Sequence, residues 1–251
     1  MKVLALIPAR YASSRFPGKP LVDILGKPMI QRVYERTSEA FSDVYVATDD
    51  ERIVACVDSF SGRSVMTSSD HRSGTDRCYE AACRISERTG EKFDIIVNVQ
   101  GDEPFIEPGQ LKDLVACFSD DSVQIATLVK RIDSAEELFD PNTPKVVKDC
   151  FNNALYFSRS PIPYCRAAED EEWLHKSRSV YFKHIGLYAY RMEVLEKITA
   201  MPCSPLEETE KLEQLRWLEA GLKIAVAESD YEGYSVDIPD DIRKIEAHFG
   251  K

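Results

Sequence analysis

The sequence predicts an α/β protein with a mostly parallel central sheet flanked by helices. Short apolar runs rich in Val and Ile alternate with helical patterns through the first half of the 251-residue chain. Such alternation is typical of βαβ units with right-handed crossovers. Pro28 and Pro108 each fit the first turn of a helix, where the missing N–H of proline has no consequence. We expect strands at 2–7, 44–48 and 94–99, and helices at 28–41, 50–59, 76–88 and 108–118.

The second half of the chain has a different pattern, with longer strands in pairs. A helix over 206–220 has clear boundaries, because Ser204 fits an N-cap, Glu207 completes a capping box and Gly221 fits the C-terminal glycine. No clean linker separates the two halves, so we expect one domain over 1–251, in which roughly residues 123–200 form a smaller excursion. We expect strands at 123–132, 145–149, 154–158, 181–190 and 223–228, a hairpin turn at Asn152-Asn153, and a final helix at 239–249.

Composition argues against several classes of function. The formal net charge of −11 argues against nucleic acid or an anionic membrane as the partner. No apolar run approaches the roughly 20 residues that span a bilayer, and no secretory signal pattern opens the chain. The seven cysteines are dispersed and form no CxxC pair. This predicts reduced thiols in a cytoplasmic protein, without a structural zinc site.

The first predicted strand leads into a short cationic loop. Residues 8–20 contain Arg10, Arg15 and Lys19 but no acid. Backbone N–H groups and fixed cations at the carboxyl end of a buried strand suit phosphate oxygens. The alternative is that residues 8–20 form a surface loop with solvated charges. Because the loop directly follows the first predicted strand, we favour a phosphate-binding loop.

Two carboxylates follow predicted apolar segments. Asp102 lies in a turn after the strand at 94–99, and Asp237 precedes the predicted final helix. Carboxylate oxygens are ligands that Mg²⁺ prefers. The alternatives are an ordinary Gly-Asp turn for Asp102 and a helix cap for Asp237. Spacing alone does not show whether the two side chains converge.

Segment 68–77 is a polar, glycine-containing entry to a helix. Such an entry presents N–H donors to a base or a sugar, or it is simply capped by Ser73 or Thr75. Taken by itself, the segment favours capping.

Two residues of the second half lie in strand-like surroundings. Arg159 suits a bidentate clamp on a carboxylate, or a salt bridge. His184 in an apolar strand is more often a structural histidine than a catalytic one. On the predicted helix 206–220, Glu213 and Gln214 lie beside an apolar stripe; they either reach a ligand or are solvated.

Nine motifs together resemble the 3-deoxy-manno-octulosonate (Kdo) cytidylyltransferase family. They run in the family's order and cover essentially the whole chain. The resemblance implies a nucleotide-diphospho-sugar transferase fold, which is Rossmann-like, with a smaller subdomain that helps to form a homodimer. The motifs are IPARYASSRFPGKPL (7–21), GKPMI (26–30), VATDD (46–50), SSDHRSGTDR (68–77), IVNVQGDEP (96–104), ALYFSRSPIP (154–163), KHIGLYAYR (183–191), SPLEETEKLEQLRWLEAG (204–221) and VDIPDD (236–241).

The resemblance also implies an activity and a set of site residues. The reaction would be CTP + Kdo → CMP-Kdo + pyrophosphate with Mg²⁺, which activates the sugar acid for lipopolysaccharide assembly. Four residues would carry catalysis. Arg10 and Lys19 would bind the phosphates, and Asp102 and Asp237 would bind Mg²⁺. The cytidine and ribose would contact Ala9, Ser69, Gly74 and Gln100. The sugar acid would contact Arg15, Arg159, His184, Tyr188, Glu213 and Gln214.

Two alternatives stay open at this point. One is the same transfer onto an amino-substituted Kdo, which the motifs do not separate from Kdo. The other is a catalytically silent nucleotide-binding subunit, although the presence of all four catalytic candidates argues against it. A sialic-acid cytidylyltransferase is disfavoured by the opening loop. The segment 164–180 matches no motif of the family.

Overall fold

Strand β1 (Val3–Ala9) forms from the first apolar run and lies between two parallel neighbours. It pairs with β4 (Val44–Thr48) on one side and with β6 (Ile95–Asn98) on the other. β5 (Ser64–Met66) adds to β4, also parallel, so the order is β6-β1-β4-β5. Every residue of β4 and β6 is buried. The continuous apolar runs in the sequence therefore reflect strands that are covered on both faces.

The computed structural model describes residues 1–12, 16–166, 180–231 and 233–249. The chain divides into two units, the first made of residues 1–112, 189–199 and 232–251, and the second of residues 113–188 and 200–231. The single domain with an excursion at 123–200 stays a prediction. Within the described ranges, no helix combines the length and apolarity needed to cross a membrane.

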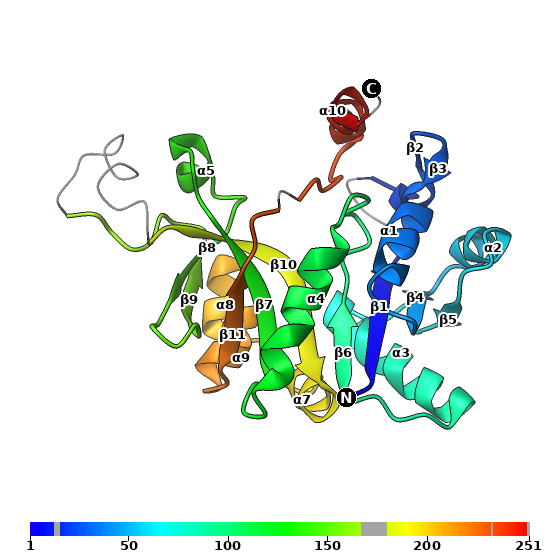
Figure 1. Ribbon diagram of the computed structural model, residues 1–251, viewed down its shortest axis with the longest axis horizontal. Coiled ribbons are helices and arrows are strands. Elements are labelled where there is room, and N and C mark those ends of the chain that lie inside the picture. Colours follow the sequence, from blue (N-terminus) through cyan, green and yellow to red (C-terminus); the bar gives the residue numbers. More distant parts are fainter. Residues whose placement is uncertain (13–15, 167–179, 232, 250–251) are drawn as a thin grey trace. The chain divides into compact units, whose positions relative to one another are not determined.

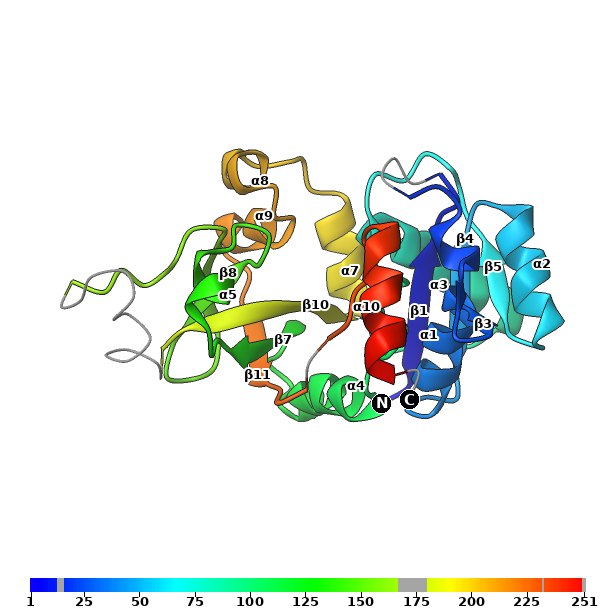
Figure 2. The same ribbon diagram turned by 90° about the horizontal axis from the view of Figure 1, so that it is seen from above.

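Helices cover both faces of the parallel sheet in the first unit (Figure 1). The chain moves from β1 through β4 to β5 by way of α1 (Met29–Ser38) and α2 (Glu51–Ser59), and it returns to β6 by way of α3 (Gly74–Thr89). After β5 the chain moves back across the sheet to β6. Because crossovers are right-handed, this reversed direction of travel places α3 on the opposite face of the sheet from α1 (Figure 2). α7 (Met192–Thr199) packs beside α3.

Several short elements complete the first unit. A turn of 3₁₀ helix at Lys19–Leu21 follows the opening loop, and a small hairpin of β2 (Asp23–Ile24) and β3 (Lys27–Pro28) precedes α1. Pro28 is the residue before α1 rather than inside its first turn, whereas Pro108 begins α4 (Pro108–Ala116) as predicted. The final helix, α10 (Pro239–Phe249), has the predicted bounds.

The second unit is built on a mixed set of strands. β7 (Ile125–Arg131) pairs in parallel with β11 (Ile224–Glu228) and lies next to β10 (Phe182–Arg191). β8 (Lys145–Lys148) is antiparallel to β10 and forms the predicted hairpin with β9 (Ala154–Ser158). Asn152 in the hairpin turn has φ +60°, a conformation that asparagine tolerates. Residues up to Tyr188 of β10 belong to this unit, and its last three residues belong to the first unit.

The single helix predicted over 206–220 is wrong. The chain forms α8 (Pro205–Glu210) and α9 (Gln214–Glu219), separated at Lys211, which has φ +54°. The predicted boundaries are nevertheless correct: Ser204 and Glu207 make a capping box, and Gly221 has φ +84° after α9. Besides the short elements around residues 19–28, the predictions also lack β5, α7 and the short α5 (Ala135–Phe139).

Candidate functional site

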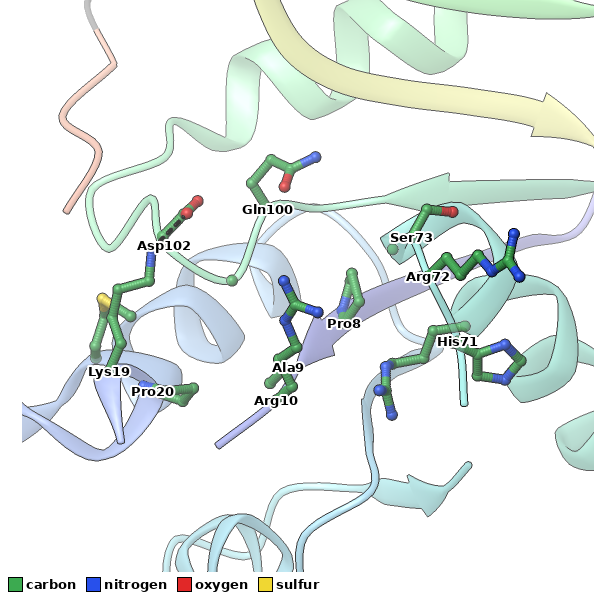
Figure 3. A pocket seen from close by; sticks show the side chains of 14 residues that line it. Pro8, Ala9, Arg10, Lys19, Pro20, His71, Arg72, Ser73, Gln100 and Asp102 are labelled. Atoms are coloured by element: carbon green, nitrogen blue, oxygen red, sulfur yellow. Dashed lines mark hydrogen bonds and ion pairs between the residues drawn. The ribbon is translucent and has the colours of Figure 1, made fainter. Parts of the chain in front are cut away.

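A cavity of about 250 Å³ lies in the first unit, at the carboxyl ends of β1 and β6 and the amino end of α3 (Figure 3). This is the edge at which open α/β sheets bind ligands. Its lining contains four arginine or lysine side chains and a single acid, in a chain with a net charge of −11. The cavity therefore suits an anionic ligand. It is lined by Pro8, Ala9, Arg10, Lys19, Pro20, Met29, His71, Arg72, Ser73, Gly74, Arg77, Gln100, Gly101 and Asp102.

Most residues predicted for the nucleotide lie in this lining. Ala9 ends β1 and Arg10 follows it, Gln100 follows β6, and Gly74 begins α3. Figure 3 shows Arg10 between Lys19 and Asp102 on one side and the segment His71–Ser73 on the other. Ser69 is exposed and is not part of the lining.

Lys19 holds two carboxylates together. Its Nζ lies 2.8 Å from Oδ2 of Asp102 and 3.9 Å from Oδ1 of Asp237. It also donates to the carbonyl oxygen of Val236 at 2.8 Å. The lysine side chain is only 15% exposed, so these oxygens replace much of its hydration. Lys19, which we predicted to bind the phosphates, thus balances the charge of Asp102 and Asp237, which we predicted to bind a metal.

The convergence of Asp102 and Asp237 has a backbone origin. The N–H of Val236 donates to the carbonyl oxygen of Asp102 at 2.9 Å, which ties the segment before α10 to the turn after β6. α10 begins at Pro239, so the residue directly before the helix is Ile238 and not Asp237. The N–H of Asp237 donates to the carboxylate of Asp241 at 3.0 Å. Across the described ranges, no group of three or more His, Cys, Asp or Glu side chains could hold a metal ion.

These two carboxylates fit Mg²⁺. Both offer hard oxygen donors beside one ammonium group, and both side chains are partly exposed, at 31% and 45%. Mg²⁺ is usually bound by one or two carboxylates, with water and substrate phosphates as its other ligands. A pair of acids next to an anion-binding cavity meets that requirement without a larger cluster.

The turn after β6 requires glycine at position 101. A Cβ there would lie 2.8 Å from the carbonyl oxygen of Pro8, closer than real Cβ atoms come. Because Pro8 and Gly101 belong to adjacent strand ends, this close approach sets how near Asp102 lies to the opening loop. The next residue, Glu103, is half-buried, and its buried Oε2 has no hydrogen-bond partner among the described residues. Burial, and secondarily the charge of Asp102, raises the pKa of Glu103 to about 7.

The polar segment before α3 is held by Glu80. Its carboxylate accepts the N–H of Ser68 at 2.9 Å, contacts the ring of His71, and pairs with Arg84 at 2.5 Å. Burial opposes ionisation, but these donors outweigh it and keep the pKa of Glu80 below its ordinary value. Ser73 caps α3 by accepting the N–H of Asp76 at 3.1 Å. The capping interpretation is therefore correct, and Ser73 also lines the cavity.

Sequence reasoning missed Arg72, His71 and Arg77 as cavity residues. Arg77 is 3% exposed, donates to Thr67 Oγ1 at 2.6 Å and lies 3.3 Å from a carboxylate oxygen of Asp49. A signal was present, because an arginine inside the motif SSDHRSGTDR falls on the first turn of a helix whose amino end faces the cavity. Helical spacing alone does not distinguish it from an exposed arginine.

Arg159, in the second unit, is held by backbone carbonyl groups. Its Nε donates to the carbonyl oxygen of Glu210 at 2.7 Å, and one terminal nitrogen donates to that of Pro141 at 2.9 Å. Its backbone N–H donates to the Glu210 carboxylate at 2.9 Å. The guanidinium group is therefore fixed in orientation by its neighbours, and within the described part of the chain it does not form the salt bridge that was the alternative.

His184 and Tyr188 lie in an aromatic cluster of the second unit. The Nε2 of His184 is 3.0 Å from Thr127 Oγ1, and the ring lies near Phe157 and Tyr188. Burial lowers the pKa of His184 to about 3, so the ring is neutral at ordinary pH. Burial also raises the pKa of Tyr188 well above its usual value, and its ring packs edge-on against Trp217.

Glu213 and Gln214 occur where α9 begins. Glu213 pairs with Arg216 at 2.8 Å. Gln214 is 4% exposed, and its Nε2 has no hydrogen-bond partner among the described residues. Of the two alternatives, solvation is therefore wrong for Gln214. Arg15 lies outside the described residues, as does most of the segment 164–180.

The predicted site residues thus form two groups by unit. The nucleotide and metal candidates that the structure describes all belong to the first unit, and the sugar-acid candidates that it describes all belong to the second.

Comparison with known proteins identifies the family. The sequence model of the cytidylyltransferases matches residues 4–224. The chain belongs to the cytidylyltransferase family. Proteins named 3-deoxy-manno-octulosonate cytidylyltransferase are similar to this cytidylyltransferase over nearly its whole length. One from Bacteroides thetaiotaomicron is 57% identical over 98% of this chain and 97% of its own. One from Parabacteroides distasonis is 55% identical over 97% and 96%.

Solved structures agree with the fold of this cytidylyltransferase. A structure of CMP:2-keto-3-deoxy-manno-octonic acid synthetase complexed with CTP matches with a TM-score of 0.89 and 44% identity, over 100% of this chain and 99% of that one. A putative glucose-1-phosphate thymidylyltransferase from Bacillus anthracis matches with a TM-score of 0.64 at 16% identity, over 98% and 94%, which shows the shared fold. The predicted family and the α/β nucleotidyltransferase fold are confirmed.

Proposed function

We propose that this cytidylyltransferase transfers the cytidylyl group of CTP to Kdo and releases pyrophosphate. The observation that carries the proposal is the cationic cavity at the strand ends, with the Lys19–Asp102–Asp237 group beside it. Relatives that cover almost the whole chain are named for this activity, and a solved relative 44% identical to it binds CTP. The product would enter lipopolysaccharide synthesis.

The cavity would hold the nucleotide. Arg10 and Lys19 would bind the phosphates, while Ala9, Gly74 and Gln100 would contact the cytidine and ribose. Ser69 stays a candidate from the family motif alone. In this transfer the anomeric hydroxyl of the sugar acid attacks the α-phosphorus in line, and the bond to pyrophosphate breaks. Fixed cations stabilise the charge that grows on the leaving pyrophosphate, and little covalent chemistry is required of the protein.

Asp102 and Asp237 would hold the Mg²⁺ ion. Bound there, Mg²⁺ would neutralise phosphate oxygens and lower the pKa of the attacking hydroxyl. Lys19 contacts both carboxylates, so it keeps them close together before any ion binds. The protein's own contribution is to fix these two acids and to supply the cations around the cavity.

The second unit would supply the acceptor contacts. Arg159 would bind the sugar carboxylate, with its guanidinium group oriented by the carbonyl groups described above. His184 is neutral and would act as a hydrogen-bonding residue rather than as a cation. The other contacts to the sugar acid would come from Tyr188, Glu213 and Gln214, and from Arg15 of the opening loop. The unpartnered Nε2 of the buried Gln214 offers a donor for a sugar hydroxyl.

The proposal includes a homodimer in the cytoplasm. All seven cysteines are free thiols, which suits a reducing compartment. Sedimentation would measure the oligomeric state directly.

Pyrophosphate release tests the activity. We would measure it from CTP and Mg²⁺, with Kdo, with an amino-substituted Kdo, and without a sugar acid. Release that requires both CTP and Kdo supports the proposal. Release only with the amino-substituted sugar would keep the nucleotide site and change the acceptor. No release with either sugar acid, despite tight CTP binding, would indicate a silent nucleotide-binding subunit.

A further inference from the structure

The backbone of Asp237 is held by a side chain from the next helix. Oδ2 of Asp241 accepts the N–H of Asp237 at 3.0 Å and the N–H of Ile238 at 3.1 Å. Its other oxygen lies 3.2 Å from Nζ of Lys244. Asp241 is the third residue of α10, and its side chain is 20% exposed. The preceding residue, Asp240, is 70% exposed and pairs with Arg243 at 3.5 Å.

The residue before Asp237 is fixed on the opposite side. Val236 is fully buried in an apolar cluster with Ile24, Met29 and Ile245 of α10. Its N–H donates to Asp102 and its carbonyl oxygen accepts from Lys19, both within 2.9 Å. Asp237 therefore lies between two anchors: the turn after β6 on one side and the first turn of α10 on the other. With both anchors in place, its carboxylate stands 3.9 Å from Lys19.

Ordinary helix capping explains only one of the two Asp241 bonds. In a capping box, the third helical residue reaches back to the N–H of the residue before the helix. The bond to Ile238 has that form. The bond to Asp237 reaches one residue further, to the residue whose carboxylate meets Lys19.

We propose that Asp241 is a positioning residue: it orients the Asp237 backbone so that the Asp237 carboxylate stands beside Asp102 for cation binding. This rests on the proposed role of Asp237. Removing the Asp241 carboxylate releases two N–H groups and lets the segment before α10 rotate. Residues that orient metal ligands typically change metal affinity or activity by about 10–100-fold when they are lost.

The test compares Asp241→Ala, Asp241→Asn and the control Asp240→Ala in the full chain. Asp240→Ala removes an acid from the same helical turn, but one that touches neither N–H group. The first readout is Mn²⁺ binding to the protein without substrates, followed by the electron paramagnetic resonance signal of the unbound ion. The second is the Mg²⁺ concentration that gives half the maximal rate of pyrophosphate release. Thermal unfolding is recorded for every variant.

We expect Asp241→Ala to weaken Mn²⁺ binding and to raise the half-saturating Mg²⁺ concentration by about tenfold. Asp241→Asn keeps an acceptor oxygen and should recover most of that loss, and Asp240→Ala should match the unmodified protein in both readouts. A purely structural cap would lower the unfolding temperature without moving the metal readouts. That result in a folded Asp241→Ala protein would overturn the proposal.

The variant Asp237→Asn separates this inference from the proposed function. If Asp237→Asn leaves Mn²⁺ binding unchanged, the metal role of Asp237 fails, and the positioning role fails with it. If Asp237→Asn weakens Mn²⁺ binding but Asp241→Ala does not, only the positioning role is overturned. The double variant with Asp237→Asn and Asp241→Ala should bind Mn²⁺ only slightly more weakly than Asp237→Asn alone, because the effects of residues that act through one another are not additive.

Discussion

The ammonium nitrogen of Lys19 lies 2.8 Å from Oδ2 of Asp102, although 83 positions separate the two residues in the chain. This pair exists because β1 and β6 are adjacent and parallel, so the loops that follow them share one edge of the sheet. The segment before α10 joins the same place through Val236. Three distant parts of the chain thus meet at one ammonium group.

Replacing either carboxylate by an amide should slow the reaction strongly while the fold survives. Asp102→Asn and Asp237→Asn each remove one charge beside Lys19, and we expect turnover to fall by about 100-fold or more. Pyrophosphate release at saturating CTP, Kdo and Mg²⁺ measures the effect, and circular dichroism verifies folding. Near-normal turnover in both variants would refute the metal assignment.

Lys19→Met should destabilise the protein as well as weaken CTP binding. The substitution leaves two carboxylates together without their cation, and hydrogen bonds to charged groups contribute about 1.5–3 kcal/mol each. We therefore expect the free energy of unfolding in urea to fall by about 2 kcal/mol. The control is Lys27→Met, which removes an exposed pair with Glu35 and should cost less than about 1 kcal/mol. Equal losses in the two variants would contradict the structure.

Gly101→Ala should disturb the strand ends. The new Cβ would meet a backbone oxygen of Pro8 rather than a movable side chain, so the two loops must separate. Overpacking of this kind costs about 1–3 kcal/mol of unfolding free energy. Because both loops line the cavity, the KM for CTP should rise in the same variant. An unchanged denaturation midpoint would show that the two loops separate without any loss of unfolding free energy, contrary to this prediction.

Protonation of His184 should contribute to acid instability. Its pKa is lowered to about 3 in the folded protein, largely by burial, against about 6.5 in the unfolded chain. Between these values the unfolded chain binds more protons, so stability is present above about pH 6.5 and is lost as pH falls toward 3, by at most about 1.4 kcal/mol per pH unit for this group. Urea unfolding from pH 7 to pH 4 measures the slope.

The slope should flatten in His184→Asn and persist in His248→Asn, which changes an exposed histidine on α10. If His184→Asn unfolds with the same pH dependence as the unmodified protein, the ring is not held neutral in the folded state.

Arg159→Lys should impair use of the sugar acid selectively. A lysine cannot reproduce the planar set of donors that Arg159 directs at two carbonyl groups. We expect the KM for Kdo to rise by about tenfold while the KM for CTP changes little. Arg131→Lys, at an exposed pair with Glu228, is the control. A larger effect on CTP than on Kdo would contradict the assignment.

Much of the fold could be predicted because the central strands of the first unit are buried on both faces. The apolar runs that became β1, β4 and β6 show this directly, and the capping signals at Ser204 and Gly221 mark real boundaries. The break at Lys211 could not be seen, because the residues around it are ordinary helix formers and tertiary packing decided the conformation. α5 was missed although Ser134 caps it, since five residues carry too little periodicity.

The site was predictable residue by residue but not as an arrangement. Spacing pointed to Asp102 and Asp237 as separate strand-end acids, and only the folded chain shows them at one lysine. Arg77 was missed because burial of an arginine depends on partners, here Thr67 and Asp49, that come from other elements. The roles of these residues in catalysis stay predictions.

The second unit is not a continuous piece of chain. It consists of two insertions, 113–188 and 200–231, with a return to the first unit between them at 189–199. A single genetic crossover cannot exchange such a unit between two genes without also cutting the first one. An engineered chimera that exchanges this unit between two relatives would therefore need four matched junctions.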